Sequence, residues 1–72
     1  MERITFDNNL CGGKPCIRGM RIRVTDVLEL LAAGISIQDI VKTELPDLEY
    51  EDVVASINYA LSKIDHPVIK AA

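Results

Sequence analysis

Two cysteines lie five positions apart at the start of residues 11–24, which read CGGKPCIRGMRIRV. The C-x4-C spacing of Cys11 and Cys16 offers two thiolates, and the single histidine, His66, is distant in the chain. A structural zinc site needs four ligands, which one chain could complete only with carboxylates. A disulfide across this turn is geometrically possible but does not suit a reducing cytosol. We therefore predict two small, partly buried thiols, with no metal and no cofactor.

No group of residues has the pattern of a catalytic site. The segment GGKP at residues 12–15 lacks the G-x4-G-K-[ST] spacing of a phosphate-binding loop and its magnesium-binding hydroxyl. His66 has no nucleophile or second histidine near it, and its position fits a cation at the negative end of a helix. The carboxylates are scattered over the starts of expected helices, where they fit caps and solvated faces. We predict that the chain is not an enzyme.

The charges are divided unevenly along the chain. Residues 1–24 carry five bases and two acids, a net charge of +3, whereas residues 25–72 carry three bases and nine acids, a net charge of −6. Such a split can mark a binding surface. Small charge imbalances also occur simply because they aid solubility. A basic segment therefore precedes an acidic body.

Four basic residues fall within ten positions of the opening stretch: Lys14, Arg18, Arg21 and Arg23. The turn glycines beside them would let the backbone approach a phosphate closely. We predict that any contact with operator DNA comes from these four side chains. The alternative is that the arginines pair with the protein's own acidic helices and never meet DNA.

The N-terminal part has the pattern of a small β-hairpin segment. Residues 3–6 alternate polar and apolar, with Ile4 and Phe6 on one face, and an Asp-Asn-Asn turn follows. Residues 16–18 and 21–24 are expected to be extended around a turn at Gly19. A lone hairpin is barely stable in water, so it must pack on the helices or pair with another chain.

The next residues predict two helices. The first begins near Thr25 as N-cap and ends before Gly34, which suits a left-handed C′ position. The second has Ser36 as N-cap, with Asp39 at the spacing of a capping box, and runs to about Glu44, before a proline.

A third helix begins after Leu48, with Glu49 as a poor N-cap and with Glu51 and Asp52 in the positive first turn. Its apolar stripe contains Val53, Val54, Ile57, Ala60, Leu61 and Ile64. Residues 65–67 end the helix. We predict a mainly α single domain over residues 1–72, with a basic β-hairpin segment at 1–24, a three-helix body at 25–66 and a flexible tail at 67–72.

Three runs of the sequence then point to a family: GGKPCIRGMRIRV, LELLAAGISIQDIV and LPDLEYEDVVASINYA. In this order and at these separations they resemble the domain-of-unknown-function 433 family, over roughly residues 4–61. Two departures are Met20, where a threonine is usual, and Glu49, where a threonine would cap the third helix. The resemblance implies a homeodomain-like trihelical body of helix-turn-helix type with a small N-terminal β element. It also implies, for at least some members, an antitoxin opposite a PIN-like ribonuclease toxin.

We therefore expect an antitoxin that binds and neutralises a PIN-like ribonuclease toxin and autoregulates its operon through operator DNA. The acidic body suits the basic surface of an RNA-handling nuclease. The apolar pair Val68 and Ile69, beyond Pro67, is expected to bind that partner, unless the tail is simply disordered. The alternatives are a stand-alone DNA-binding regulator, which the acidic helices disfavour, and a homodimeric scaffold without nucleic-acid contact.

A homodimer is also expected because so short a chain leaves apolar surface and strand edges uncovered. We place the contact at the strand around Ile4 and Phe6, or at residues 22–24. No apolar run approaches the length of a membrane span and the N-terminus has no signal pattern, so a cytoplasmic location is expected.

Overall fold

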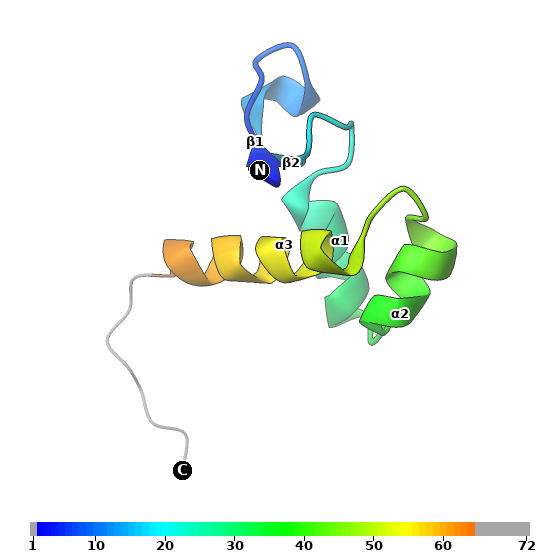
Figure 1. Ribbon diagram of the computed structural model, residues 1–72. Coiled ribbons are helices and arrows are strands. Elements are labelled where there is room, and N and C mark those ends of the chain that lie inside the picture. Colours follow the sequence, from blue (N-terminus) through cyan, green and yellow to red (C-terminus); the bar gives the residue numbers. More distant parts are fainter. Residues whose placement is uncertain (1, 65–72) are drawn as a thin grey trace.

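A computed structural model describes residues 2–64, and over this range a small strand pair sits above a body of three helices (Figure 1). The strands are β1 (Ile4–Thr5) and β2 (Cys16–Ile17). The helices are α1 (Val24–Ala32), α2 (Ile37–Asp39, continued by a π-helical stretch at Ile40–Glu44) and α3 (Tyr50–Lys63). The expected mainly α class with a small N-terminal β element is confirmed.

Strands β1 and β2 pair antiparallel, with Ile4 opposite Ile17 and Thr5 opposite Cys16. Between them the chain makes a 3-10 turn at Cys11–Gly13. The expected turn at Gly19 is present, since Gly19 has a φ of +72° and the Ile17 N–H donates to the Ile22 carbonyl at 2.9 Å. However, only one bridge, between Cys16 and Arg23, joins the two sides of this turn. The main partner of β2 is therefore β1 rather than residues 21–24.

Helix α1 begins one residue before the expected cap. Arg23, not Thr25, is the N-cap, because the carboxylate of Asp26 accepts the Arg23 backbone N–H at 2.9 Å. At the other end the N–H groups of Gly34 and Ile35 donate to the carbonyls of Leu31 and Leu30. Gly34 has a φ of +89°, so its predicted left-handed geometry is confirmed.

Helix α2 starts as the sequence predicts, because the Ser36 hydroxyl accepts the Asp39 N–H at 3.1 Å. The helix then widens, and the Leu45 N–H donates to the Ile40 carbonyl at 2.7 Å, five residues back. It ends at Glu44, before Pro46, as expected. The π-helical stretch itself was not predicted.

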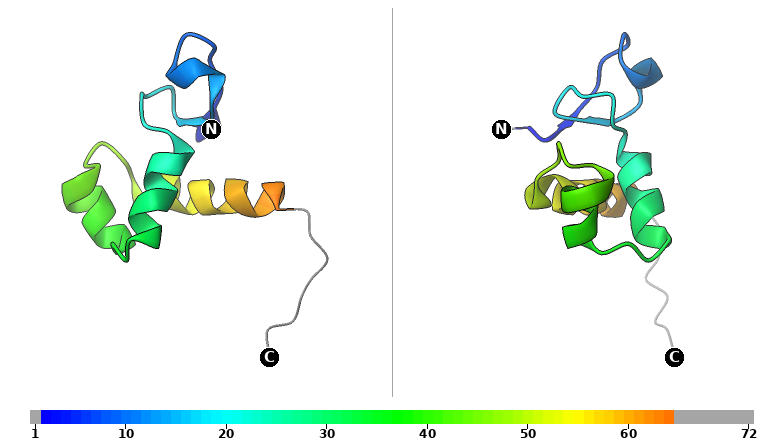
Figure 2. Two further views of the ribbon diagram at one scale, coloured as in Figure 1. Left: turned by 180° about the vertical axis from the view of Figure 1, so that it is seen from behind. Right: turned by 90° about the vertical axis from the view of Figure 1, so that its right-hand side faces the viewer.

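The core lies where the three helices and β2 meet. Its buried apolar side chains are Ile17, Val24, Val27, Ile40, Leu48 and Val53. The long apolar stripe expected on α3 is wrong at its end, because Leu61 and Ile64 are 61% and 62% exposed. The view from behind shows why, since the last turns of α3 project beyond α1 and α2 (Figure 2, left). No helix within residues 2–64 has the length and apolarity to cross a membrane.

Candidate functional site

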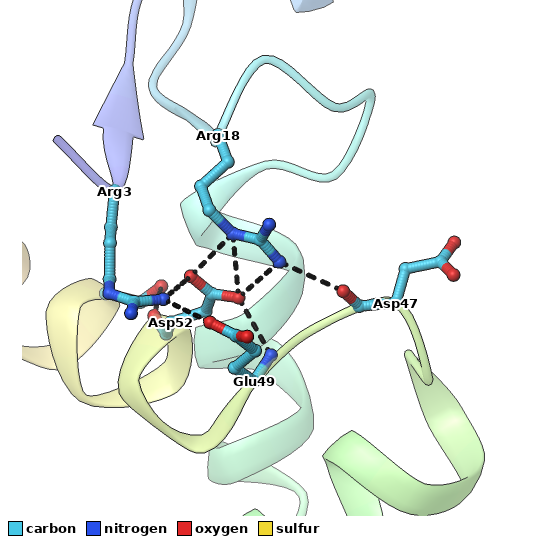
Figure 3. Close-up of polar contacts among 6 residues, drawn as sticks. Arg3, Arg18, Asp47, Glu49 and Asp52 are labelled. Carbon is cyan, nitrogen blue, oxygen red and sulfur yellow. Dashed lines mark hydrogen bonds and ion pairs between the residues drawn. The ribbon is translucent and has the colours of Figure 1, made fainter. Parts of the chain in front are cut away.

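The most heavily bonded side chain of the described residues is Asp52, in the first turn of α3 (Figure 3). Its carboxylate is completely buried. Arg18 contacts both of its oxygens, with Nη2 at 2.8 Å from Oδ2 and Nε at 3.0 Å from Oδ1. Arg3 Nη1 lies 2.8 Å from Oδ1 and also 2.8 Å from Oε1 of Glu49. Two guanidinium groups thus converge on one buried acid.

The strand pair brings these two arginines together. Arg3 directly precedes β1 and Arg18 directly follows β2, so antiparallel pairing places them opposite each other. The Arg18 N–H donates to the Arg3 carbonyl at 2.9 Å. Arg18 has a φ of +45°, a left-handed conformation that few residues other than glycine adopt. The residue that makes the long-range ion pair with Asp52 thus also has a strained backbone, at the turn after β2.

The remaining hydrogen-bonding capacity of the Asp52 carboxylate is filled by a backbone N–H of the chain. The backbone N–H of Glu49 donates to Asp52 Oδ2 at 2.8 Å, which ties the carboxylate to the start of the helix. Arg18 Nη2 also donates to the Asp47 carbonyl at 3.1 Å, so the guanidinium spans the turn before α3. With all these donors in place, Asp52 is a structural anchor and offers no free oxygen to a substrate.

Burial would raise the pKa of Asp52, but the hydrogen bonds outweigh it. Donation from Arg18, from the Glu49 backbone and from Arg3 stabilises the charged form and holds the pKa below its usual range. Asp26 behaves similarly, because the Arg23 backbone and side chain lower its pKa against the effect of burial. Both carboxylates are therefore ionised at neutral pH.

Two of the four candidate DNA-binding residues are already in ion pairs. Arg18 is bound to Asp52, and Arg23 Nη2 lies 3.0 Å from Asp26 Oδ1. This is the intramolecular alternative raised by the sequence. Lys14 and Arg21 are exposed, and within residues 2–64 neither has an ion-pair partner. DNA contact by these side chains stays a prediction. The expected partner residues Val68 and Ile69 lie outside the described residues.

The two cysteines are free thiols, as predicted. Cys16 is buried and donates to the Lys14 carbonyl at 3.3 Å. Burial, followed by the neighbouring Cys11 thiol, raises the pKa of Cys16 to about 11. Within residues 2–64 no three Cys, His, Asp or Glu side chains are grouped to hold a metal ion.

Sequence reasoning missed the roles of Arg3 and Asp52. Asp52 was predicted only as an acid in the positive first turn of the helix, yet it lies next to buried Val53 and one helical turn before buried Ser56, on the inner face of α3. That position on the helix was the available signal. Glu49 is the N-cap residue of α3, and its carboxylate pairs with Arg3.

An open apolar groove of about 550 Å³ lies between β1 and the middle of α3. Its lining comprises Glu2, Arg3, Ile4, Phe6, Ala55, Asn58 and Tyr59. The rings of Phe6 and Tyr59 are 6.0 Å apart, and the Lys63 ammonium lies 5.2 Å from the centre of the Tyr59 ring. We call this surface the β1–α3 groove.

A second surface surrounds the start of α3. Four exposed acids stand there within eight residues: Glu44, Asp47, Glu49 and Glu51. We call these residues the acidic turn. Arg3 pairs with Glu49, and the other three acids have no ion-pair partner within residues 2–64.

The model of the family described as "Protein of unknown function (DUF433)" matches residues 4–60. This chain belongs to the DUF433 family. The match runs from β1 through most of α3, so it includes Arg18, Asp52, the acidic turn and most of the β1–α3 groove, whereas Arg3 and Glu2 precede it. Neither a search of curated proteins nor a search of solved structures found a match.

Proposed function

We propose that this DUF433 protein is a protein-binding antitoxin that neutralises a PIN-like ribonuclease. The observation that carries the proposal is the contrast between its interior and its surface. The buried charged site is saturated by intramolecular bonds, whereas Glu44, Asp47 and Glu51 of the acidic turn have no ion-pair partner within residues 2–64. Around the start of α3, the charged groups available to a partner are therefore carboxylates.

An acidic surface of this kind fits a nuclease. A protein that handles RNA presents basic side chains to phosphates, and a compact group of carboxylates can occupy the same basic cleft. Complementary charge also speeds encounter between the two proteins. The ordered turn before α3 supports the acids, since the Asp47 carbonyl is held by Arg18 and Glu49 is held by Arg3.

Operator contact by the antitoxin or its complex is the second part of the proposal. It would depend on Lys14 and Arg21, the two candidate bases free of ion pairs within residues 2–64. Helix α3 has exposed Glu51 in its first turn and Lys63 only in its last, so it is a poor recognition helix for DNA. A stand-alone regulator is correspondingly less well supported.

The test is whether a gene beside this one encodes a PIN-like ribonuclease, and whether this protein inhibits RNA cleavage by that enzyme. Unmodified protein should block cleavage, and Glu44→Lys or Asp47→Lys should weaken inhibition by at least tenfold. Glu29→Lys is the matched control, because it makes the same charge change at an exposed position on α1. Melting temperatures verify that all variants remain folded.

Two results would overturn the proposal. One is uninhibited nuclease in the presence of excess unmodified protein. The other is equal inhibition by the three charge-reversed variants, which would remove the acidic turn from the mechanism. Deleting residues 67–72 separately tests Val68 and Ile69, since full protection by the shortened chain would confine binding to the folded body.

A further inference from the structure

Strand β1 has a free backbone edge at Ile4. In an antiparallel pair, residues alternate between those that bond the partner strand and those that point away from it. The Arg18 N–H donates to the Arg3 carbonyl, while the Ile17 N–H donates to Ile22 on the far side of β2. The backbone carbonyl of Arg3 therefore faces β2. The next residue, Ile4, lies opposite Ile17 and directs its N–H and C=O to the outer edge. Apart from the bonds within the strand pair itself, no backbone hydrogen bond among residues 2–64 uses these two groups.

The free edge belongs to the β1–α3 groove, which is also apolar. Phe6 is 60% exposed although its ring lies against Tyr59. Ile4 packs against the core and also lines the groove. An uncovered strand edge beside exposed apolar side chains is a surface suited to pairing with another chain.

We propose that a second copy of this chain occupies the groove. In this dimer the β1 strands pair antiparallel around a two-fold axis at Ile4. A residue with both its N–H and its C=O on the free edge can exchange two hydrogen bonds with its own copy, which is the self-complementarity that a two-fold axis needs. The result is a four-stranded sheet in the order β2, β1, β1 of the copy, β2 of the copy. Such a sheet removes the weakness of an isolated strand pair.

The charges around the groove also fit a second copy. Antiparallel pairing centred on Ile4 places Glu2 of one chain opposite Phe6 of the other. Phe6 and Lys63 contact the same Tyr59 ring, so Glu2 arrives beside Lys63 of the opposing chain. A rim that carries charges of both signs, as Glu2 and Lys63 do, matches its own rotated copy, whereas a uniformly basic nuclease fits the acidic turn.

This dimer does not depend on the proposed antitoxin function. The groove uses Ala55, Asn58 and Tyr59 in the middle of α3, whereas the acidic turn lies at the start of that helix. Pairing through β1 therefore leaves an acidic turn exposed on each copy. Failure of nuclease inhibition would leave the dimer intact, and a monomeric protein could still inhibit.

Sedimentation equilibrium of the full chain provides the first test. Unmodified protein should be dimeric at about 100 μM, two orders of magnitude above a ~1 μM dissociation constant. Phe6→Glu should raise that constant at least tenfold, because it places a charge in the interface. Tyr50→Glu is the matched control, since Tyr50 is a similarly exposed aromatic residue outside the groove. A monomeric unmodified chain, or equal effects of the two variants, would overturn the proposal.

Amide hydrogen exchange tests the register directly. Exchange of the Ile4 N–H should slow as the protein concentration rises through the dimerisation range. Exchange of the Thr5 N–H, which faces β2, should change much less. A dimer whose Ile4 amide stays unprotected would exclude strand pairing. Protection that is independent of concentration and is lost on deleting residues 65–72 would show that the chain's own C-terminal segment fills the edge.

Exchanging the charges of Glu2 and Lys63 tests whether these side chains meet in the dimer. Glu2→Lys and Lys63→Glu should each weaken dimerisation, because each brings like charges together. The double variant should restore it, since the opposite charges then meet again in exchanged positions. Additive weakening in the double variant would contradict this register.

Discussion

The guanidinium of Arg18 contacts both carboxylate oxygens of Asp52, which lies 34 residues further along the chain (Figure 3). Asp52 is fully buried, and Arg18 retains about a quarter of its side-chain exposure. The pair fastens the strand segment to the start of α3. Arg3 adds a second attachment to the same carboxylate at 2.8 Å.

Replacing Asp52 should therefore destabilise the domain. Asp52→Ala leaves two guanidinium groups without their shared acid and removes the acceptor of the Glu49 N–H, for an expected loss of about 3 kcal/mol. Glu51→Ala, at the exposed neighbouring position, should cost less than ~1 kcal/mol. Urea denaturation of both variants measures the difference. Equal midpoints would show that the Asp52 contacts add nothing to stability.

The lowered pKa of Asp52 predicts a loss of stability in acid. The unfolded carboxyl titrates at its ordinary pKa of about 3.9, whereas the folded one holds its charge to lower pH. Its contribution is therefore complete above the unfolded pKa and is lost as the pH falls through the folded pKa. The free energy of unfolding should decline below about pH 4, and Asp52→Asn should flatten that decline. An identical pH slope in the variant would contradict the assignment.

Gly34 should tolerate no β-branched residue. A Cβ built at this position meets nothing within 4 Å, so the cost of Gly34→Val comes from its φ of +89°. We expect a loss of more than ~1 kcal/mol. Ala33→Val is the control, because Ala33 has an ordinary helical backbone. A Gly34→Val melting temperature equal to that of the control would refute the strain argument.

The thiols should differ in reactivity. At pH 8 a group with a pKa of about 11 is almost entirely protonated, and Cys16 is also buried. Iodoacetamide should therefore modify partly exposed Cys11 first and reach Cys16 only when the domain opens. Mass spectrometry of digested protein gives the order. Faster labelling of Cys16 would show that the hairpin opens readily.

The salt dependence of DNA affinity distinguishes Lys14 and Arg21 from the ion-paired Arg18. If the protein binds a duplex from its own promoter, Lys14→Ala with Arg21→Ala should flatten the slope of log affinity against log salt by about two units. Arg18→Ala should instead lower the melting temperature, because it breaks the pair with Asp52. A flattened slope in Arg18→Ala at unchanged stability would reverse these roles.

Local backbone chemistry explains what the sequence could predict. Gly34, Ser36 and the residues before Pro46 act through bonds within a few positions, and each ends or begins a helix as expected. The Arg18–Asp52 pair joins residues 34 positions apart, which no local pattern reports.

Two further features differ from what the local pattern predicts. The π-helical stretch Ile40–Glu44 was not predicted from the local pattern, which gave only a helix ending near Glu44. Leu61 and Ile64 continue a helical apolar stripe, but within the described residues no element covers them. The candidate DNA-binding bases could be located in the sequence, whereas the distant acidic partner of Arg18 could be identified only in the folded chain.

The two arginine attachments also set an order of events during synthesis. Arg3 and Arg18 leave the ribosome long before Asp52, with 49 and 34 residues separating them from their acid. Contacts across such separations carry a larger loop-closure cost than those within a helix. We therefore expect the helices to form first and the N-terminal strands to dock last. Until the strands dock on Asp52, nothing holds the free edge at Ile4 in place. The newly made chain should therefore pair with a second copy only after the start of α3 has been synthesised.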